Sequence, residues 1–114
     1  MLMNMNTPIW LCTTPTDMRK SFDGLSALVR NQLQLNPMSA QWFVFINKRK
    51  TQMKILYFDQ DGFCIWCKRL EQGQFNYPAS ETGKQPLDMA QLQLLIKGIK
   101  IEQSRQYKRY SSPV

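Results

Sequence analysis

The chain has 114 residues, enough for one domain with a hydrophobic core that needs no disulfide or metal. Its 15 lysines and arginines outnumber eight acidic residues and give a net charge of +7, which favours an anionic partner, nucleic acid first and an acidic protein or membrane surface second. The absence of histidine excludes Ser-His-Asp and Cys-His catalysis within the chain.

The first predicted element is a strand at Ile9–Cys12, a short apolar run with a β-branched residue. Thr16 or Asp17 is expected to cap a helix over residues 18–33. Apolar residues at helical spacing form one stripe on this helix: Phe22, Leu25, Leu28, Val29 and Leu33. Gly24 within it either permits close packing or marks a late helix start.

Three strands are predicted next, at Trp42–Ile46, 53–58 and 63–70, because these runs are rich in aromatic and β-branched residues. The second and third are separated by Asp-Gln-Asp-Gly, and its Asp61-Gly62 pair is typical of a hairpin turn, since glycine tolerates a positive φ. The strands therefore form an antiparallel meander. They lack clean alternation, which indicates that both sheet faces are partly covered.

Residues 71–86 are predicted to form a short strand around Phe75 and then a loop. Asp88 is expected to cap a final helix, with Gln91 at the capping-box position and Gly98 near the end. Its apolar stripe comprises Met89, Leu92, Leu95, Ile96 and Ile99.

The predicted fold class is α+β: one domain over residues 1–101, with a small antiparallel sheet of about three to five strands packed by an N-terminal and a C-terminal helix. Residues 102–114 form a basic tail that is expected to fray. Five cations lie between Lys97 and Arg109, so this end either follows a phosphate backbone or simply aids solubility.

The segment between the first two strands of the meander is unusually basic. It carries Lys48, Arg49 and Lys50, and Lys54 follows near the start of the next strand. Three cations on a turn suit phosphate contact, where each neutralised phosphate releases counterions, and Lys54 shares a strand face with Leu56 and Phe58. Lys68 and Arg69 are expected to extend this strip across the sheet. The alternative is a solvated turn with edge-protecting lysines.

Arg19 and Lys20 form a second candidate anion site at the predicted helix start. Basic residues at a helix start are unfavourable, because they lie near the positive end of the helix dipole. A bound anion would account for their position, since it could contact their charges and the free backbone N–H groups together. The alternative is that Asp17 pairs with a nearby cation and the remaining charge is solvated.

Neither the cysteines nor the carboxylates indicate a metal or cofactor site. Cys64 and Cys67 are three apart on a predicted strand and face opposite sides, so structural packing is expected. Together with Cys12 the chain has three cysteines, an odd number, and no export signal precedes them. This predicts reduced thiols and a cytoplasmic location. No segment approaches the roughly 20 apolar residues of a membrane span.

A metal-dependent nuclease is a third, weaker alternative to nucleic-acid binding and protein docking. It would use Asp17, Asp59 and Asp61 to hold Mg²⁺. Asp59 and Asp61 are explained more simply by the turn, and Asp17 by a cap, so no catalytic residue and no cofactor is predicted.

Three stretches together resemble one family: residues 14–29, 42–75 and 87–99 are similar to TnpB, the small accessory protein of insertion sequence 66 elements. The likeness covers roughly residues 7–101, and its densest runs are T-D-M-R-K-x-F-D-G-L, D-x-D-G-F-C and K-R-L-E-x-G. This family is distinct from the RNA-guided nucleases that share the name. The sequence departs from the family's usual pattern at three places. Ser21 replaces a glycine, and Lys-Arg-Lys-Thr-Gln-Met replaces a glycine-containing basic turn. The segment Lys-Gly-Ile-Lys-Ile lacks the usual acidic residue.

The resemblance implies a bacterial protein that is needed for transposition beside a separate transposase carrying the catalytic acids. Its expected partners are DNA at the element ends, RNA as a second nucleic acid, and the transposase or other element-encoded proteins, with no membrane; the oligomeric state stays open. The predicted nucleic-acid-binding residues are Arg19, Lys20, Lys48, Arg49, Lys50, Lys54, Lys68 and Arg69. The alternative is an adaptor that docks on the transposase through an exposed aromatic, among Trp10, Trp42, Tyr57 and Trp66.

Overall fold

The computed structural model describes residues 6–98, so the predicted tail and Ile99 lie outside the described part of the chain. Five strands are present: β1 (Ile9–Cys12), β2 (Trp42–Ile46), β3 (Gln52–Asp59), β4 (Gly62–Arg69) and β5 (Lys84–Leu87). The helices are α1 (Phe22–Leu28), which continues as the π-helical turn η1 (Val29–Leu33), and α2 (Met89–Ile96). The α+β class is therefore confirmed for residues 6–98.

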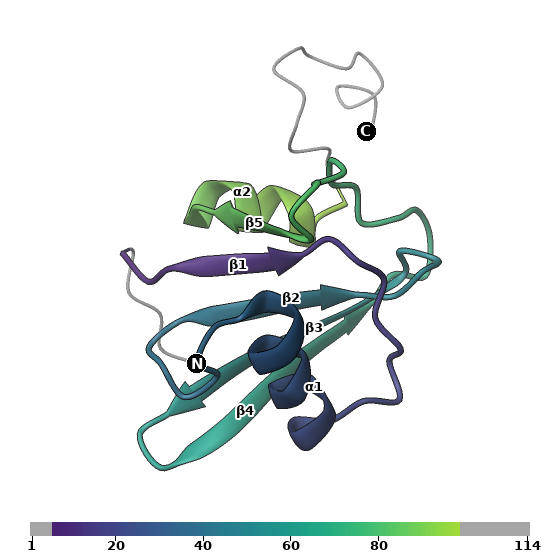
Figure 1. Ribbon diagram of the computed structural model, residues 1–114. Helices are drawn as coiled ribbons and strands as arrows, with labels where there is room; N and C mark the ends of the chain where they lie inside the picture. Colours follow the sequence, from purple (N-terminus) through teal and green to yellow (C-terminus); the bar gives the residue numbers. More distant parts are fainter. Residues whose placement is uncertain (1–5, 99–114) are drawn as a thin grey trace.

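The five strands form one mixed sheet in the order β4-β3-β2-β1-β5 (Figure 1). The antiparallel meander of β2, β3 and β4 is confirmed. The expectation of a wholly antiparallel sheet is wrong, because β1 runs parallel to β2 with Ile9 opposite Trp42. Parallel neighbours need a long crossover, and the segment that contains α1 and η1 supplies it.

A second correction concerns residues 71–86. The predicted strand around Phe75 is absent; this side chain is fully buried, and its N–H donates to the Lys50 carbonyl at 2.7 Å. The fifth strand instead comes from Lys84–Leu87, which pairs antiparallel with β1. Its Pro86 is tolerated because β5 lies at the sheet edge, where one side of the strand needs no hydrogen bonds.

Local capping residues predicted the start of one helix correctly and the start of the other wrongly. Asp88 caps α2 and Gln91 completes the capping box, as predicted. The first helix begins later than expected, with Ser21 as N-cap and no side-chain cap, so neither Thr16 nor Asp17 caps it. Thr16 is buried and donates its N–H to the Ile46 carbonyl at 2.9 Å, which fixes the chain before the helix to the end of β2.

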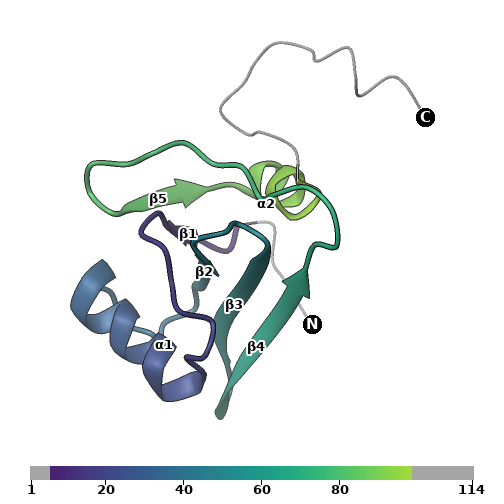
Figure 2. The ribbon, with the colours of Figure 1, turned by 90° about the vertical axis from the view of Figure 1, so that its right-hand side faces the viewer.

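Apolar side chains fill both faces of the sheet. One cluster combines helix residues with alternate strand residues: Cys12, Leu25, Val29, Leu33, Phe43, Phe45 and Leu56. The other combines α2 with the remaining strand positions: Ile9, Leu11, Trp42, Val44, Ile46, Met53, Ile55, Phe75, Leu87, Leu92 and Leu95. Figure 2 shows the two helices on different sides of the strands. Every residue of β2 is buried, which explains its unbroken apolar run.

Among the described residues, 6–98, no helix combines the length and apolar character needed to cross a membrane.

Candidate nucleic-acid interface

The basic turn between β2 and β3 is built around one asparagine. Asn47 Oδ1 accepts N–H bonds from Thr51 at 2.8 Å and from Gln52 at 3.0 Å, and its carbonyl accepts the Lys50 N–H at 3.0 Å. Lys50 adopts a φ of +61°, the conformation that glycine would otherwise supply. The closed turn leaves the side chains of Lys48 and Arg49 exposed.

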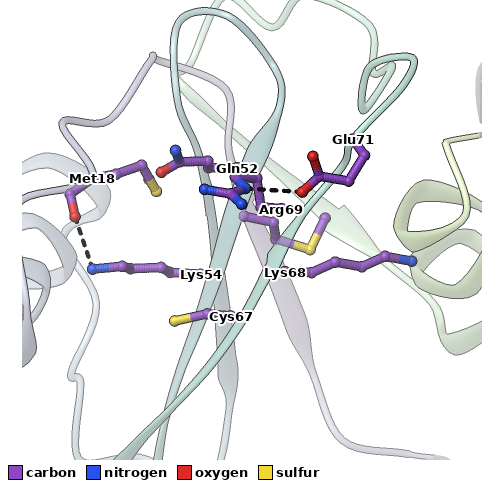
Figure 3. Close-up of a pocket in the computed structure, with 8 residues that line it drawn as sticks. Met18, Gln52, Lys54, Cys67, Lys68, Arg69 and Glu71 are labelled. Atoms are coloured by element: carbon purple, nitrogen blue, oxygen red, sulfur yellow. Dashed lines mark hydrogen bonds and ion pairs between the residues drawn. The ribbon is translucent and has the colours of Figure 1, made fainter.

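Two adjoining hollows lie beside this turn and share Met18 and Gln52. The first is lined by Thr16, Asp17, Met18, Arg19, Asn47, Lys48, Arg49 and Gln52. The second, drawn in Figure 3, is lined by Met18, Gln52, Met53, Lys54, Cys67, Lys68, Arg69 and Glu71. Three segments distant in sequence therefore meet at one end of the sheet, and six of the eight predicted residues line the two hollows.

The remaining two predicted residues lie close to this place in different ways. Lys20 is exposed and follows Arg19 in the same turn before α1. Lys50 is half-buried, and its Nζ lies 4.7 Å from the centre of the Tyr77 ring, so its charge faces the segment after β4.

Lys54 uses its charge inside the protein. Its Nζ donates to the backbone carbonyls of Met18 and Lys20, each at 2.8 Å, and so fixes the turn before α1 to the face of β3. This places Arg19 beside the basic turn. With two carbonyl partners and a half-buried side chain, Lys54 positions its neighbours instead of presenting a free ammonium group.

Lys68 also binds a backbone carbonyl, on the opposite face of the sheet. Its Nζ donates to Ile96 at the end of α2 at 3.0 Å, where the helix dipole favours a cation. Figure 3 shows the Lys54 and Lys68 side chains pointing away from each other across β3 and β4. The predicted strip of charge across one face therefore does not include Lys68.

A third lysine, which the sequence analysis did not select, also binds a distant backbone carbonyl. Lys84 Nζ donates to the Leu33 carbonyl at 2.8 Å and lies 5.2 Å from the centre of the Trp10 ring. It fixes the end of η1 to the β5 edge. The acceptor is a backbone oxygen 51 residues away, so no local sequence pattern indicates the contact.

Two of the predicted arginines carry acidic neighbours. Arg19 pairs with Asp17 at 2.7 Å and Arg69 with Glu71 at 3.1 Å, and all four side chains are exposed. Hydrogen bonds from Arg19 hold the pKa of the Asp17 carboxyl at about 2. Exposed pairs of this kind contribute little to stability, so a phosphate can replace the carboxylate at small cost.

Lys20, Lys48 and Arg49 differ from these arginines, because no acidic group lies within 4.0 Å of their charged atoms among residues 6–98. Together with the two arginines they form a set that we call the basic rim. The basic rim comprises Arg19, Lys20, Lys48, Arg49 and Arg69.

The carboxylates and cysteines that were considered for metal binding do not lie together in the structure. Asp59 and Asp61 lie at the β3–β4 turn, whereas Asp17 lies beside Gln52 at the opposite end of β3. Within residues 6–98 no three metal-binding side chains come together. Cys64 is opposite Tyr57 and Cys67 is opposite Lys54, so the two thiols occupy different faces of β4, as predicted. Cys64 is half-buried but Cys67 is exposed, so the expected packing role is wrong for Cys67.

Of the aromatic residues proposed as docking anchors, one is buried and three are half-buried: Trp42 is the buried one, and the others are Trp10, Tyr57 and Trp66. Trp42 is buried and stacks on Tyr57 with ring centres 4.9 Å apart. Trp10 donates to Gln41 Oε1 at 2.8 Å, and Trp66 packs against the cluster on the α2 face.

Comparison with known proteins agrees with the resemblance seen in the sequence. A family model described as IS66 Orf2-like protein (TnpB) matches residues 7–106. The uncharacterised protein y4hO of Sinorhizobium fredii (strain NBRC 101917 / NGR234) is 37% identical over 94 residues, 82% of each chain. Protein y4jC of the same strain is 33% identical over 91 residues, 80% of this chain and 78% of that protein. No solved structure matches. The chain therefore belongs to the IS66 Orf2-like (TnpB) family, whose members serve transposition of IS66 elements as accessory proteins.

Proposed function

We propose that this protein is a non-catalytic, cytoplasmic accessory factor of transposition that binds element DNA through the basic rim. One observation carries the proposal: cations from three separate segments meet beside two adjoining hollows, and Lys48 and Arg49 are exposed without an acidic partner among residues 6–98. Unopposed charge at one place repels itself, so a polyanion that neutralises it is the simplest reason for its position.

The rim is suited to the phosphate backbone more than to the bases. Lys20 and Lys48 are flexible point charges, and Arg19 and Arg69 already hold carboxylates in exposed pairs that phosphates can replace. Contacts of this type position a protein on DNA and carry little sequence information. The proposed binding is therefore strongly dependent on salt and weakly dependent on sequence.

Two arginines provide a matched test of the location. Arg49 lies in the rim, and Arg30 is also an exposed arginine but lies on η1, outside both hollows. Arg49→Gln should weaken duplex binding several-fold, and Lys48→Gln with Arg49→Gln should reduce the slope of log K against log [salt] by about 0.9 for each phosphate that the variant no longer neutralises. Fluorescence anisotropy measures both quantities.

Arg30→Gln removes the same charge and should leave the affinity nearly unchanged. Equal losses in the two single variants would show that net charge alone drives binding, which contradicts the proposal. Competition with single-stranded RNA decides between DNA and RNA as the preferred polyanion.

The second candidate function is an adaptor that docks on the transposase without touching DNA. Its favoured surface would use the large apolar side chains that are exposed among residues 6–98: Phe22, Met38 and Leu94. Transposase binding that resists salt, together with no measurable affinity for DNA, would support this role in place of the first.

A further inference from the structure

We infer that β4 is an assembly edge at which two copies of this chain pair antiparallel, joining their sheets into one. This inference does not depend on DNA binding. It rests on the position of β4 in the sheet, on its unprotected backbone and on the distribution of charge along it.

β4 is an outer strand of the sheet, and β3 is the only strand that pairs with it among residues 6–98. Eight consecutive pairs, from Asp59 opposite Gly62 to Gln52 opposite Arg69, leave no bulge. A long regular edge strand is a ready template for another strand, so soluble proteins usually protect such edges.

The opposite edge shows what protection looks like in this fold. β5 has only four residues, includes Pro86, and carries Lys84 at its start. β4 has twice the length, no proline, and no charge before Lys68. The half-buried side chains of Phe63 and Ile65 lie along it. β4 therefore lacks the devices that keep β5 from pairing.

The outward backbone groups of β4 follow from its pairing with β3. Leu70 N–H donates to the Thr51 carbonyl at 2.8 Å, which makes this pair a hydrogen-bonded one. Hydrogen-bonded and non-hydrogen-bonded pairs alternate in an antiparallel ladder. The residues that direct N–H and C=O groups away from β3 are therefore Phe63, Ile65, Cys67 and Arg69.

The charge along β4 favours a second copy as the occupant. The strand follows a turn with Asp59 and Asp61 and ends at Lys68 and Arg69, so its two ends have opposite sign. Because Lys68 is held by the Ile96 carbonyl, the cation that a second copy can reach is Arg69, whose pair with Glu71 is exposed. A twofold axis through Ile65 places Ile65 against its own copy, Phe63 against Cys67, and Asp61 of one copy beside Arg69 of the other. An isologous interface requires such self-complementarity, and the axis forms each contact twice.

Sedimentation equilibrium of the full chain without nucleic acid tests the pairing. The parent should dimerise reversibly, and Asp61→Lys should raise the dimer dissociation constant about tenfold, because like charges then meet at both ends of the interface. Adding Arg69→Glu to this variant should restore much of the affinity. Glu81→Lys makes the same charge change at an exposed residue near the opposite edge and should have no effect.

A cross-linking experiment tests the same edge without relying on charge. In a Cys64→Ser, Cys67→Ser background, Ile65→Cys should form a covalent dimer on mild oxidation, since directly paired Cα atoms lie about 5.5 Å apart. Gln60→Cys, which the proposed register places away from the axis, should not. A monomer at every soluble concentration, or a dimer that Asp61→Lys leaves unchanged and Ile65→Cys does not cross-link, overturns the inference.

Discussion

At the residue scale, the same side-chain type serves two purposes in this protein. Lys54, Lys68 and Lys84 donate to backbone carbonyls, whereas Lys48 and Arg49 remain exposed. A sequence shows where positive charge lies, but not which carbonyl will be within reach of it. The sequence therefore indicates the exposed turn cations Lys48 and Arg49, but neither the contact of Lys50 with Tyr77 nor the carbonyl contacts of Lys54 and Lys68.

The two predicted alternatives for Asp17 are resolved by its geometry. The carboxylate accepts the Arg19 N–H at 2.9 Å and pairs with its guanidinium, so the alternative of an ion pair with a nearby cation is correct and the cap is not. Asp17 and Arg19 are only two residues apart, so their spacing in the sequence was the signal that could have predicted this ion pair.

The Asp17 pair predicts a specific titration. NMR titration of the Asp17 carboxyl carbon should give a pKa of about 2 in the parent. Arg19→Gln should return this pKa part of the way toward 3.8, because the guanidinium hydrogen bonds are removed while the backbone N–H of residue 19 still donates to the carboxylate. The pair therefore adds to stability above about pH 3.8, and this contribution disappears as the pH falls through about 2. Lys20→Gln, which removes only a weaker charge effect, should move the pKa much less. An equal shift in both variants would contradict the dominant role of Arg19.

At the element scale, the sequence predicted correctly those helices and strands whose ends are set by neighbouring residues. The Asp88–Gln91 capping box and the aromatic runs of the meander were visible in the sequence. β5 was missed because Lys84–Leu87 is poor in strand-forming residues and is ordered by pairing with β1, more than 70 residues earlier. The parallel direction of β1 was missed for the same reason: it is decided by the crossover and not by the strand's own residues.

The turn before α1 depends on a single ammonium group, which gives an element-scale prediction. Lys54→Met keeps the aliphatic stem and removes the donor to Met18 and Lys20, so it should lower the free energy of unfolding by about 1–2 kcal/mol. Urea denaturation measures the change. Lys48→Met is the matched control, and its exposed position predicts an effect within about 0.5 kcal/mol. Equal effects of the two changes would show that the carbonyl contacts are energetically unimportant.

At the scale of the whole molecule, the fold forms two surfaces that meet at Arg69, which belongs to the basic rim and ends β4. The basic rim lies at the end of the sheet where β3 begins, and the outer side of β4 extends from it toward the acidic β3–β4 turn. The net charge of +7 predicted an anionic partner in general terms. That the turn before α1 joins the β2–β3 turn at one rim could not be predicted, because this depends on a crossover and on Lys54 binding two distant carbonyls.

The most direct test of DNA binding through the basic rim is an NMR titration of the ¹⁵N-labelled chain with short duplex DNA at low salt. We expect amide shifts to concentrate at residues 16–20 and 47–52 and at Arg69, and added salt to reverse them together. Shifts centred instead on β5 and the neighbouring Glu81 turn, or no shifts at all in these three places, would contradict DNA binding through the basic rim.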